Sequence, residues 1–175
     1  MKTKAAAILP IYESAQGIQV VLGHLRPLHP DRRYSPVPNI RDHGGEWIAL
    51  ATRLRTNEEP THAARRAFYQ NTAGAKIGDL ELLTQYQDPA RGLHIDFYTS
   101  HIMGSSIKSA GNKYFELKAN TPQDWITHIH SRPGNLDANG TLSLAAQEIG
   151  LAQAPARRIP QGTVQALEEL ARMYR

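Results

Sequence analysis

Hydrophobic residues along the chain gather in short runs with the alternating spacing of β-strands, and polar turn-forming segments separate these runs. Two such runs open the sequence, at residues 4–12 and 17–26, and the segment 13–17 between them has the composition of a hairpin turn. Further strands are predicted at residues 46–50, 80–86, 93–103 and 113–117. The pattern therefore predicts a sheet that begins with a hairpin.

Four other segments have the signals of helices. Pro60 suits the first turn of a helix that runs to about Thr72, with Gly74 as its stop. The other three predicted helices begin at Pro122, span residues 141–149 and span residues 161–174. Residues 27–45 contain four prolines and two glycines without periodicity, which predicts a long surface loop. Strands followed by helices in this order predict a mixed α/β fold.

The helix predicted from Pro60 has two faces of different character. Ala64 and Phe68 are one turn apart and are expected to face the core. The neighbouring face consists of small or neutral polar residues, which are Ala63, Ala67, Gln70 and Asn71. This second face decides the chemistry that we expect from the segment.

The composition of the chain is that of an ordinary globular protein, with 41% hydrophobic and 21% charged residues. At this length, folding buries roughly 70% of the unfolded surface, so we expect a single domain over residues 1–175 with a helical extension at about 141–175. No apolar run reaches the ~18 residues of a membrane span, and no signal-peptide pattern is present, so a cytoplasmic protein is expected. Because there is no cysteine, any metal ligands would be His, Asp or Glu.

The net charge of +4 arises entirely in the N-terminal part of the chain. Residues 1–75 contain 10 Lys/Arg and 6 Asp/Glu, whereas residues 76–175 contain 10 of each. Such an imbalance favours an anionic partner, either a phosphorylated molecule or nucleic acid, although no Lys/Arg run is present and the charge could serve solubility alone.

The segment 52–74 carries a spaced motif. Glu58 follows Thr52 by six positions, Arg66 follows Glu58 by eight, and Phe68 stands two positions after Arg66. This spacing resembles the Nudix box, G-x5-E-x7-R-E-U-x-E-E-x-G-U, where U is a bulky aliphatic residue. A tryptophan strand from Trp47 precedes the segment, as in that family, and the similarity covers roughly residues 3–131. The resemblance implies the Nudix fold, in which a mixed β-sheet lies between helices.

The chain departs from the family at three metal-binding positions of the box. There the family has helix glutamates that hold Mg²⁺ or Mn²⁺, whereas this chain has Ala67, Gln70 and Asn71. A methyl group cannot coordinate a cation, and two amides supply none of the negative charge of a hard-cation site. The resemblance therefore implies a Nudix fold without a metal site or a Mg²⁺ cofactor, and with severely impaired box-type hydrolysis.

The charged residues that remain around the box allow two interpretations each. Glu58 and Arg66 either belong to a ligand site or form an ion pair that holds the loop to the helix. Arg53 and Arg55 either bind an anion through charge-assisted hydrogen bonds or are solvated surface charges.

Other candidates come from outside the box. His43 and Glu46, in and after the long loop, are candidates with Glu58 for an acid or base in a relocated mechanism. His94 and Asp96 lie on the strand predicted at 93–103, and we expect them to share a face only if that strand bulges.

Three functions follow as hypotheses. The first is a Nudix-fold protein that binds a nucleotide-like or other phosphorylated ligand without Mg²⁺-dependent hydrolysis, using Arg53, Arg55, Arg66, Gln70 and Asn71. The second is an enzyme with relocated or metal-free catalytic residues, drawn from Glu58, Glu46 and His43. The third is a structural or partner-binding module. The sequence leaves the ligand and the oligomeric state open.

Overall fold

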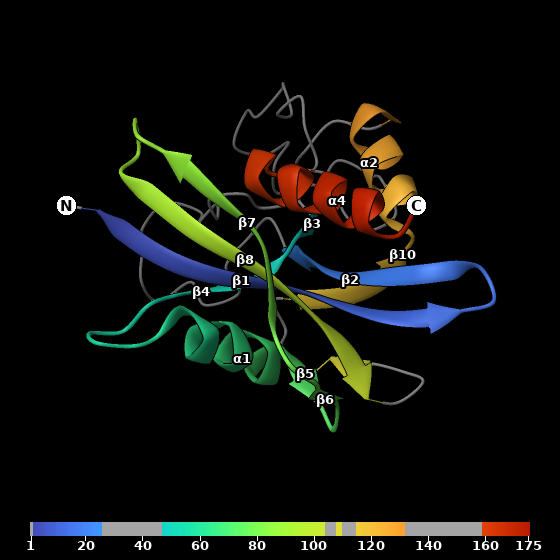
Figure 1. Cartoon of the computed structure of the whole chain (residues 1–175), viewed down its shortest axis with the longest axis horizontal. Helices are drawn as coiled ribbons and strands as arrows, with labels where there is room; N and C mark the ends of the chain where they lie inside the picture. Colours follow the sequence, from blue (N-terminus) through green and yellow to red (C-terminus); the bar gives the residue numbers. More distant parts are fainter. Residues whose placement is uncertain (1, 26–46, 104–107, 110–114, 132–158) are drawn as a thin grey trace, which may run out of the picture.

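A computed structural model describes residues 2–25, 47–103, 108–109, 115–131 and 159–175 (Figure 1). An eight-stranded mixed sheet forms its centre, with the path β10-β2-β1-β8-β6, while β3 pairs with β2, β4 with β1 and β7 with β8. The bounds of these strands are β1 Thr3–Ser14, β2 Gly17–Leu25, β3 Trp47–Ile48, β4 Leu50–Arg53, β6 Lys76–Ile77, β7 Glu81–Asp88, β8 Leu93–Met103 and β10 Phe115–Asn120. Two further strands, β5 Thr72–Ala73 and β9 Lys108–Ser109, pair with each other.

The sheet is mixed because β1 lies parallel to β8, whereas its pairings with β2 and β4 are antiparallel. Two glycine turns join the long strands. Gly17 follows the β1–β2 turn with a φ of 101°, and Gly92 ends the β7–β8 turn with a φ of 61°, values that only glycine adopts readily. The first turn brings β2 beside β1, and the second brings β8 beside β7.

Helices cover both faces of the sheet. Helix α1 (Pro60–Asn71) lies on one face, and α2 (Pro122–Ser131) and α4 (Gln161–Met173) lie on the other (Figure 1). Alternate residues of β1 contribute to two separate cores, because successive strand side chains point to opposite faces. Ala6 and Ile8 pack with Phe68 of α1, whereas Ala7 and Leu9 pack on the α4 side.

Tryptophan residues anchor the α4 side. Trp125 of α2 is fully buried, and its indole Nε1 donates a hydrogen bond of 2.9 Å to the carbonyl oxygen of Val20. Its ring centroid lies 5.1 Å from that of Trp47. The core on this side also contains Leu167 and Leu170 of α4, so the final helix is an integral layer of the fold.

The structure confirms the mixed α/β fold class and most of the long elements. The single strand predicted at 46–50 was wrong, because the chain there forms β3 and β4, which pair with β2 and β1 respectively. The short strands β5, β6 and β9 were not predicted, since two residues carry no readable alternation. The predicted loop at 27–45 and the predicted helix at 141–149 lie outside the described residues. Among the helices that the structure describes, none has the length and apolar character of a membrane span.

Candidate functional site

The segment between β4 and α1 is held by one arginine. Arg66 of α1 donates hydrogen bonds to both carboxylate oxygens of Glu58, at 3.0 Å from Nε and 2.8 Å from Nη2. Its remaining contacts are with the strand before the loop, through Thr52 Oγ1 at 3.0 Å and the Arg53 carbonyl oxygen at 2.9 Å. The Glu58 carboxylate also accepts the Arg55 backbone N–H at 2.8 Å. The ion pair between Glu58 and Arg66 therefore joins β4, the loop and the helix.

These contacts stabilise the ionised form of Glu58. The hydrogen bond from Arg66, followed by that from the Arg55 backbone, lowers the pKa of Glu58 from 4.5 to about 2, and the same pair raises the pKa of Arg66. The carboxylate is therefore charged at neutral pH and already satisfied by its partners. A carboxylate held in this way fixes the loop to the helix and is a weak base. We call the Glu58–Arg66 ion pair, together with its hydrogen bonds to Thr52, Arg53 and Arg55, the clamp.

The face of α1 that carries Ala67, Gln70 and Asn71 does not form one open surface. Ala67 is fully buried in the interior. Asn71 is 8% exposed, and its side-chain amide donates a hydrogen bond of 2.7 Å to the Ala67 carbonyl oxygen. Gln70 is exposed to solvent. Of these three side chains, Gln70 alone is both polar and open to a ligand.

Arg53 and Arg55 are exposed, and no described residue forms an ion pair with either side chain. Their backbones are fixed, because the Arg53 carbonyl and the Arg55 amide both belong to the clamp. Arg53 lies two residues after Ala51 on β4, so the two side chains project from the same face of the strand.

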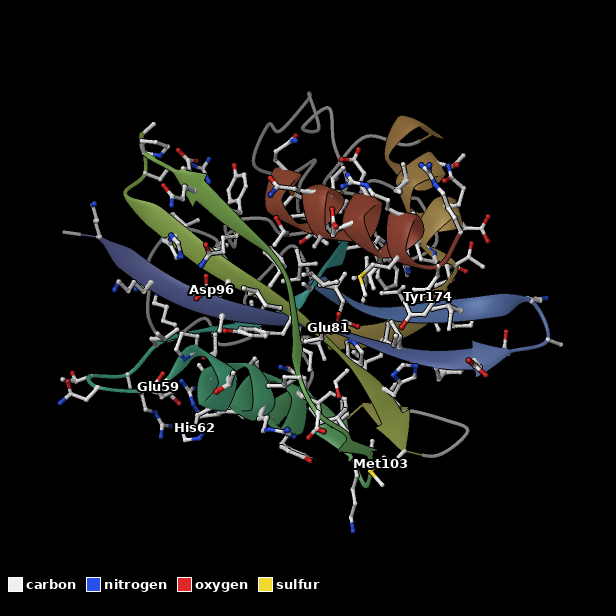
Figure 2. All side chains as sticks on the ribbon, in the orientation of Figure 1. Glu59, His62, Glu81, Asp96, Met103 and Tyr174 are labelled. Atoms are coloured by element: carbon white, nitrogen blue, oxygen red, sulfur yellow. The ribbon has the colours of Figure 1, made fainter. Side chains whose placement is uncertain are left out.

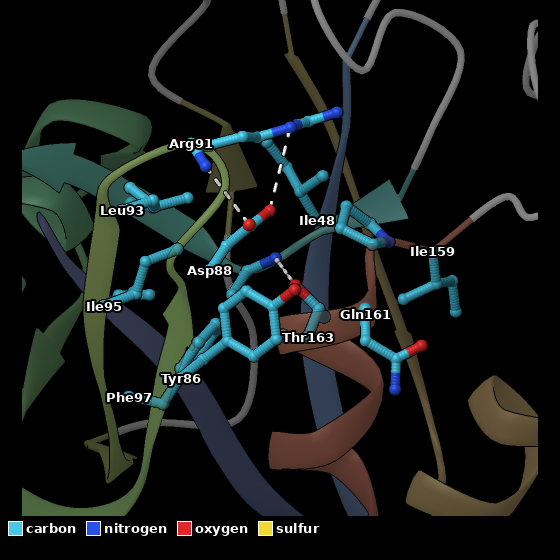
Figure 3. A pocket seen from close by; sticks show the side chains of 15 residues that line it. Ile48, Tyr86, Asp88, Arg91, Leu93, Ile95, Phe97, Ile159, Gln161 and Thr163 are labelled. Carbon is cyan, nitrogen blue, oxygen red and sulfur yellow. Dashed lines mark hydrogen bonds and ion pairs between the residues drawn. The ribbon is translucent and has the colours of Figure 1, made fainter. Parts of the chain in front are cut away.

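A cavity of about 370 Å³ lies on that face, between the sheet and the start of α4 (Figure 3). Its walls are mainly apolar and aromatic, with Tyr86 of β7 and Phe97 of β8 on one side and Ile48 and Ile159 on the other. Ala51 of β4 also lines the cavity. Because Arg53 projects from the same face of β4, it lies toward the side of the cavity that this strand forms. The cavity therefore combines a ring-sized apolar space with nearby positive charge.

Polar groups mark the mouth of this cavity. Asp88 and Arg91 of the β7–β8 turn form an ion pair at 3.7 Å and line the cavity together. Thr163 lies near the start of α4, and its hydroxyl accepts a hydrogen bond of 3.4 Å from the Ala49 backbone N–H (Figure 3). We call this the aromatic cavity below.

The close approach of α4 to the sheet depends on Gly162. A Cβ atom at this position would lie 3.1 Å from Phe97 Cζ and 3.1 Å from Tyr86 Cδ1. These distances are shorter than ordinary van der Waals contact, so no larger residue fits without movement of the helix or the rings. Gly162 therefore sets the position of the α4 wall of the cavity.

We call residues 54–59, between β4 and α1, the box loop. A second cavity, of about 590 Å³, is lined by this loop, by the residues before and at the start of β1, and by β8. His94 and Asp96 lie side by side there, with His94 Nε2 at 2.9 Å from Asp96 Oδ1. The expectation that these residues need a bulge to share a face was wrong. Residues i and i+2 of a regular strand point to the same face, and β8 pairs with β1 in unbroken register at this point.

No family model matches the sequence, and no curated protein matches it. Solved structures do. A Nudix hydrolase from M. smegmatis, RenU, is 14% identical, with a TM-score of 0.53 over 97% of this chain and 84% of that one. The MutT Nudix hydrolase from Burkholderia pseudomallei is 12% identical, with a TM-score of 0.56 over 97% and 98% of the two chains. The Nudix domain of Shewanella oneidensis NrtR, solved in complex with ADP ribose, is 13% identical, with a TM-score of 0.61 over 99% and 88%.

The chain has the Nudix fold. The fold that the box resemblance implied is thereby confirmed, including the mixed sheet between helices.

The residues at the metal positions of the box do not fit a hard divalent cation. Ala67 has no donor atom, the Asn71 amide bonds to its own helix, and the Glu58 carboxylate is neutralised by Arg66. Across the described part of the chain, no cluster of three or more His, Asp or Glu residues has a geometry that could hold a metal. Residues 67, 70 and 71 of this helix therefore present no anionic donor.

The remaining predicted site residues fall into two groups. The structure brings Glu58, Arg66, Arg53 and Arg55 together around the box loop. Glu46 and His43 lie outside the described residues.

The sequence analysis missed most of the aromatic cavity. Tyr86, Arg91, Gln161 and Thr163 were not singled out, because they come from a strand, a turn and a helix whose packing no local pattern records. The one available signal was the turn at residues 88–92, where Arg91 is a charged residue between predicted strands.

Proposed function

We propose that this Nudix-fold protein binds a nucleotide-like phosphorylated ligand in the aromatic cavity and does not hydrolyse it by metal-dependent box chemistry. The observation that carries the proposal is the pairing of an aromatic-walled cavity with a box helix that has neutral residues at the metal positions.

The shape and chemistry of the cavity support a planar ring as part of the ligand. Its volume of about 370 Å³ lies within the ~300–1,000 Å³ range of small-molecule sites. Tyr86 and Phe97 offer aromatic surface, which favours stacking with a nucleobase. The ADP ribose bound to the Nudix domain of NrtR is a ligand of that chemistry in a protein of the same fold, and it provides a suitable probe.

The charged part of the ligand would lie toward β4 and the β7–β8 turn. Arg53 shares a strand face with Ala51 of the cavity wall, and Arg91 stands at the mouth. Guanidinium groups bind phosphate oxygens through paired hydrogen bonds. Arg66 is occupied by Glu58, so Arg53, Arg55 and Arg91 are the arginines that we propose for the ligand.

The proposed absence of box-type turnover rests on the donor chemistry of α1. Hydrolysis of a phosphoanhydride in this manner requires neutralisation of the leaving phosphate and activation of water by a cation. Ala67 and Asn71 offer no anionic donor, and Gln70 offers a neutral carbonyl. Binding without turnover is the expected outcome.

Isothermal titration calorimetry with ADP-ribose tests the binding, and ³¹P NMR of the same mixture with Mg²⁺ or Mn²⁺ tests the turnover. Tyr86→Ala should weaken binding at least about fivefold, because loss of one stacking partner costs ~1–3 kcal/mol. Tyr69→Ala is the matched control, since Tyr69 is 47% exposed on α1 and does not line the cavity. Equal affinity of both variants would remove the aromatic cavity from the proposal, and cleavage of ADP-ribose at an enzymatic rate would refute binding without turnover.

A further inference from the structure

The second cavity lies on the α1 face of the sheet, at the opposite side of the β7–β8 turn from the aromatic cavity. Lys4 of β1 and Lys2, just before that strand, line it together with the box loop and the ends of β7 and β8. Backbone hydrogen bonds fix its floor, from Leu54 N–H to the Lys4 carbonyl at 3.0 Å and from Thr3 N–H to the Gly92 carbonyl at 2.7 Å. We call it the polar cavity.

A chain of three side chains orients an imidazole at this cavity. Asp96 is 9% exposed, and its Oδ1 accepts a hydrogen bond of 2.7 Å from Gln85 Nε2 and contacts His94 Nε2 at 2.9 Å. An ionised carboxylate can only accept, so the neutral imidazole carries its proton on Nε2 and leaves Nδ1 as an acceptor. No described residue forms a hydrogen bond with Nδ1. Figure 2 shows Asp96 on β8, with Glu59 at the box loop.

The carboxylates around the polar cavity have cationic partners, with one exception. Glu58 is paired with Arg66, Asp88 with Arg91, and Asp96 contacts His94. Glu59 is exposed, and no described residue forms an ion pair with it. The four carboxylates therefore leave one uncompensated negative charge when His94 is protonated and two when it is neutral.

The two lysines have no such partners. No described residue forms an ion pair with Lys2 or Lys4, and both are exposed along the cavity. Together with Glu59 they leave a net charge of about +1 when His94 is protonated and compensates Asp96, and about zero when it is neutral. Tyr98, on the same strand face, does not alter this balance, because burial, followed by Asp96 and Glu59, raises its pKa above 10.

We propose that the polar cavity binds a small tetrahedral dianion, of the chemistry of a phosphate group, between Lys2, Lys4 and His94, and that protonation of His94 strengthens this binding. The site is separate from the aromatic cavity and does not rest on the function proposed for it. Asp96 and Gln85 act as positioning residues, because they hold the imidazole with Nδ1 available. In its protonated form Nδ1–H donates to the anion, and in its neutral form the same atom presents a lone pair that repels it.

Sulfate is a suitable probe because it remains a dianion between pH 5.5 and 8, so that any pH dependence belongs to the protein. Amide shifts in ¹H–¹⁵N NMR spectra, at an ionic strength held constant with chloride, should change around Lys4, Leu54, Glu59 and His94. The dissociation constant should rise roughly three- to tenfold from pH 5.5 to pH 8, because the neutral imidazole of His94 offers the anion no Nδ1–H donor.

Two pairs of variants separate this site from a general attraction of anions to a basic protein. Lys2→Ala/Lys4→Ala should weaken sulfate binding about tenfold at pH 5.5, whereas Lys76→Ala, an exposed lysine on β6, should leave it unchanged. His94→Gln should make the affinity independent of pH, because glutamine retains a donor for Asp96 and does not titrate. His101→Gln, an exposed histidine on the same strand, is the matched control.

Two results would overturn the proposal. Sulfate shifts that are scattered over the surface, or that are equally strong in the double lysine variant and in Lys76→Ala, would show that the cavity is not an anion site. A His94→Gln protein that keeps the full pH dependence of the wild type would show that Gln85, Asp96 and His94 form a structural cross-strand contact without a role in binding.

Discussion

The two faces of the sheet meet at the β7–β8 turn, where Asp88 and Leu93 line a cavity on each side. On the α4 face the cavity has aromatic and aliphatic walls, and helix α4 closes it through the contact at Gly162. On the α1 face the cavity has charged walls, and the Glu58–Arg66 ion pair holds the loop that borders it. The same strands thus border a mainly apolar cavity on one side and a charged cavity on the other.

Comparing the two faces shows which features of the Nudix fold are present although the metal positions of the box carry neutral residues. The α1 face contains the ion pair that fixes the box loop, and Ala67 and Asn71 are buried. The cavity on the α4 face includes none of those positions, because residues of β1, β3, β4, β7, β8 and α4 line it. The ligand binding that we propose for the α4 face therefore does not require a metal ion at the box positions.

The largest expected effect comes from truncating one phenylalanine on each face. Phe68 of α1 is fully buried against the sheet and Phe97 is 2% exposed beside the aromatic cavity, so Phe68→Ala and Phe97→Ala should each lower the free energy of unfolding by about 3–5 kcal/mol. Urea denaturation measures both losses. Only Phe97→Ala should also weaken ADP-ribose binding, by roughly tenfold, at a temperature where both variants are folded. Equal losses of affinity would mean that the two faces are not independent.

A smaller loss of stability is expected from adding a methyl group where α4 packs against the sheet. Gly162→Ala places a methyl group 3.1 Å from Tyr86 and Phe97 and should destabilise the protein by about 1–3 kcal/mol, even though alanine favours helices by up to ~1 kcal/mol. Gly78→Ala is the matched control, because its nearest neighbours would lie at 3.9 Å, and it should change stability by less than about 0.5 kcal/mol. Thermal unfolding of both variants measures the difference in stability. A Gly162→Ala variant as stable as the wild type would show that α4 packs less tightly on Tyr86 and Phe97 than the structure indicates.

The contribution of the Glu58–Arg66 ion pair to the free energy of unfolding should depend on pH in the acidic range. The pKa of Glu58 is lowered to about 2, so as the pH falls the unfolded chain takes up the proton first. The contribution of Glu58 to stability is therefore complete above about pH 5 and is lost as the pH falls from 4.5 toward 2. Urea denaturation at pH 6, 4 and 3 should show the wild type losing its advantage over Glu58→Gln, with Glu168→Gln, at an exposed residue of α4, as control. An advantage that is constant across this range would contradict the clamp.

The smallest expected change in stability concerns Arg91 at the mouth of the aromatic cavity. Its side chain is 64% exposed and lies 3.7 Å from Asp88, so Arg91→Ala should change the free energy of unfolding by less than about 0.5 kcal/mol. Calorimetry should nevertheless show ADP-ribose binding several-fold weaker, because a phosphate contact is lost. Unchanged affinity would assign Arg91 to the turn alone.

Local sequence signals predicted the long elements of the fold. Pro60 at the first position of α1 and the hairpin turn that ends at Gly17 are cues that act over a few residues, and the structure has both where they were predicted. The ion pair between Glu58 and Arg66 was one of the two interpretations that the sequence left open for these residues, and the structure contains it.

Tertiary structure decided what the sequence left open. The parallel pairing of β1 with β8 places residues about 90 positions apart in register, and no local pattern specifies it. The aromatic cavity depends on that pairing and on the seating of α4 against Tyr86 and Phe97, so its residues could not be identified from spacing. The burial of Ala67 and the inward amide of Asn71 were also invisible, because a helical wheel gives the direction of a side chain and not what covers it.

The sequence by itself determined that the metal positions of the box carry no acidic residue, because the identity of a donor atom is fixed by the residue type. It also determined the hairpin and the helices α1, α2 and α4, whose signals are local. The two cavities, the availability of His94 and the neutralisation of Glu58 were decided by the tertiary structure, because each depends on distances between groups from separate elements.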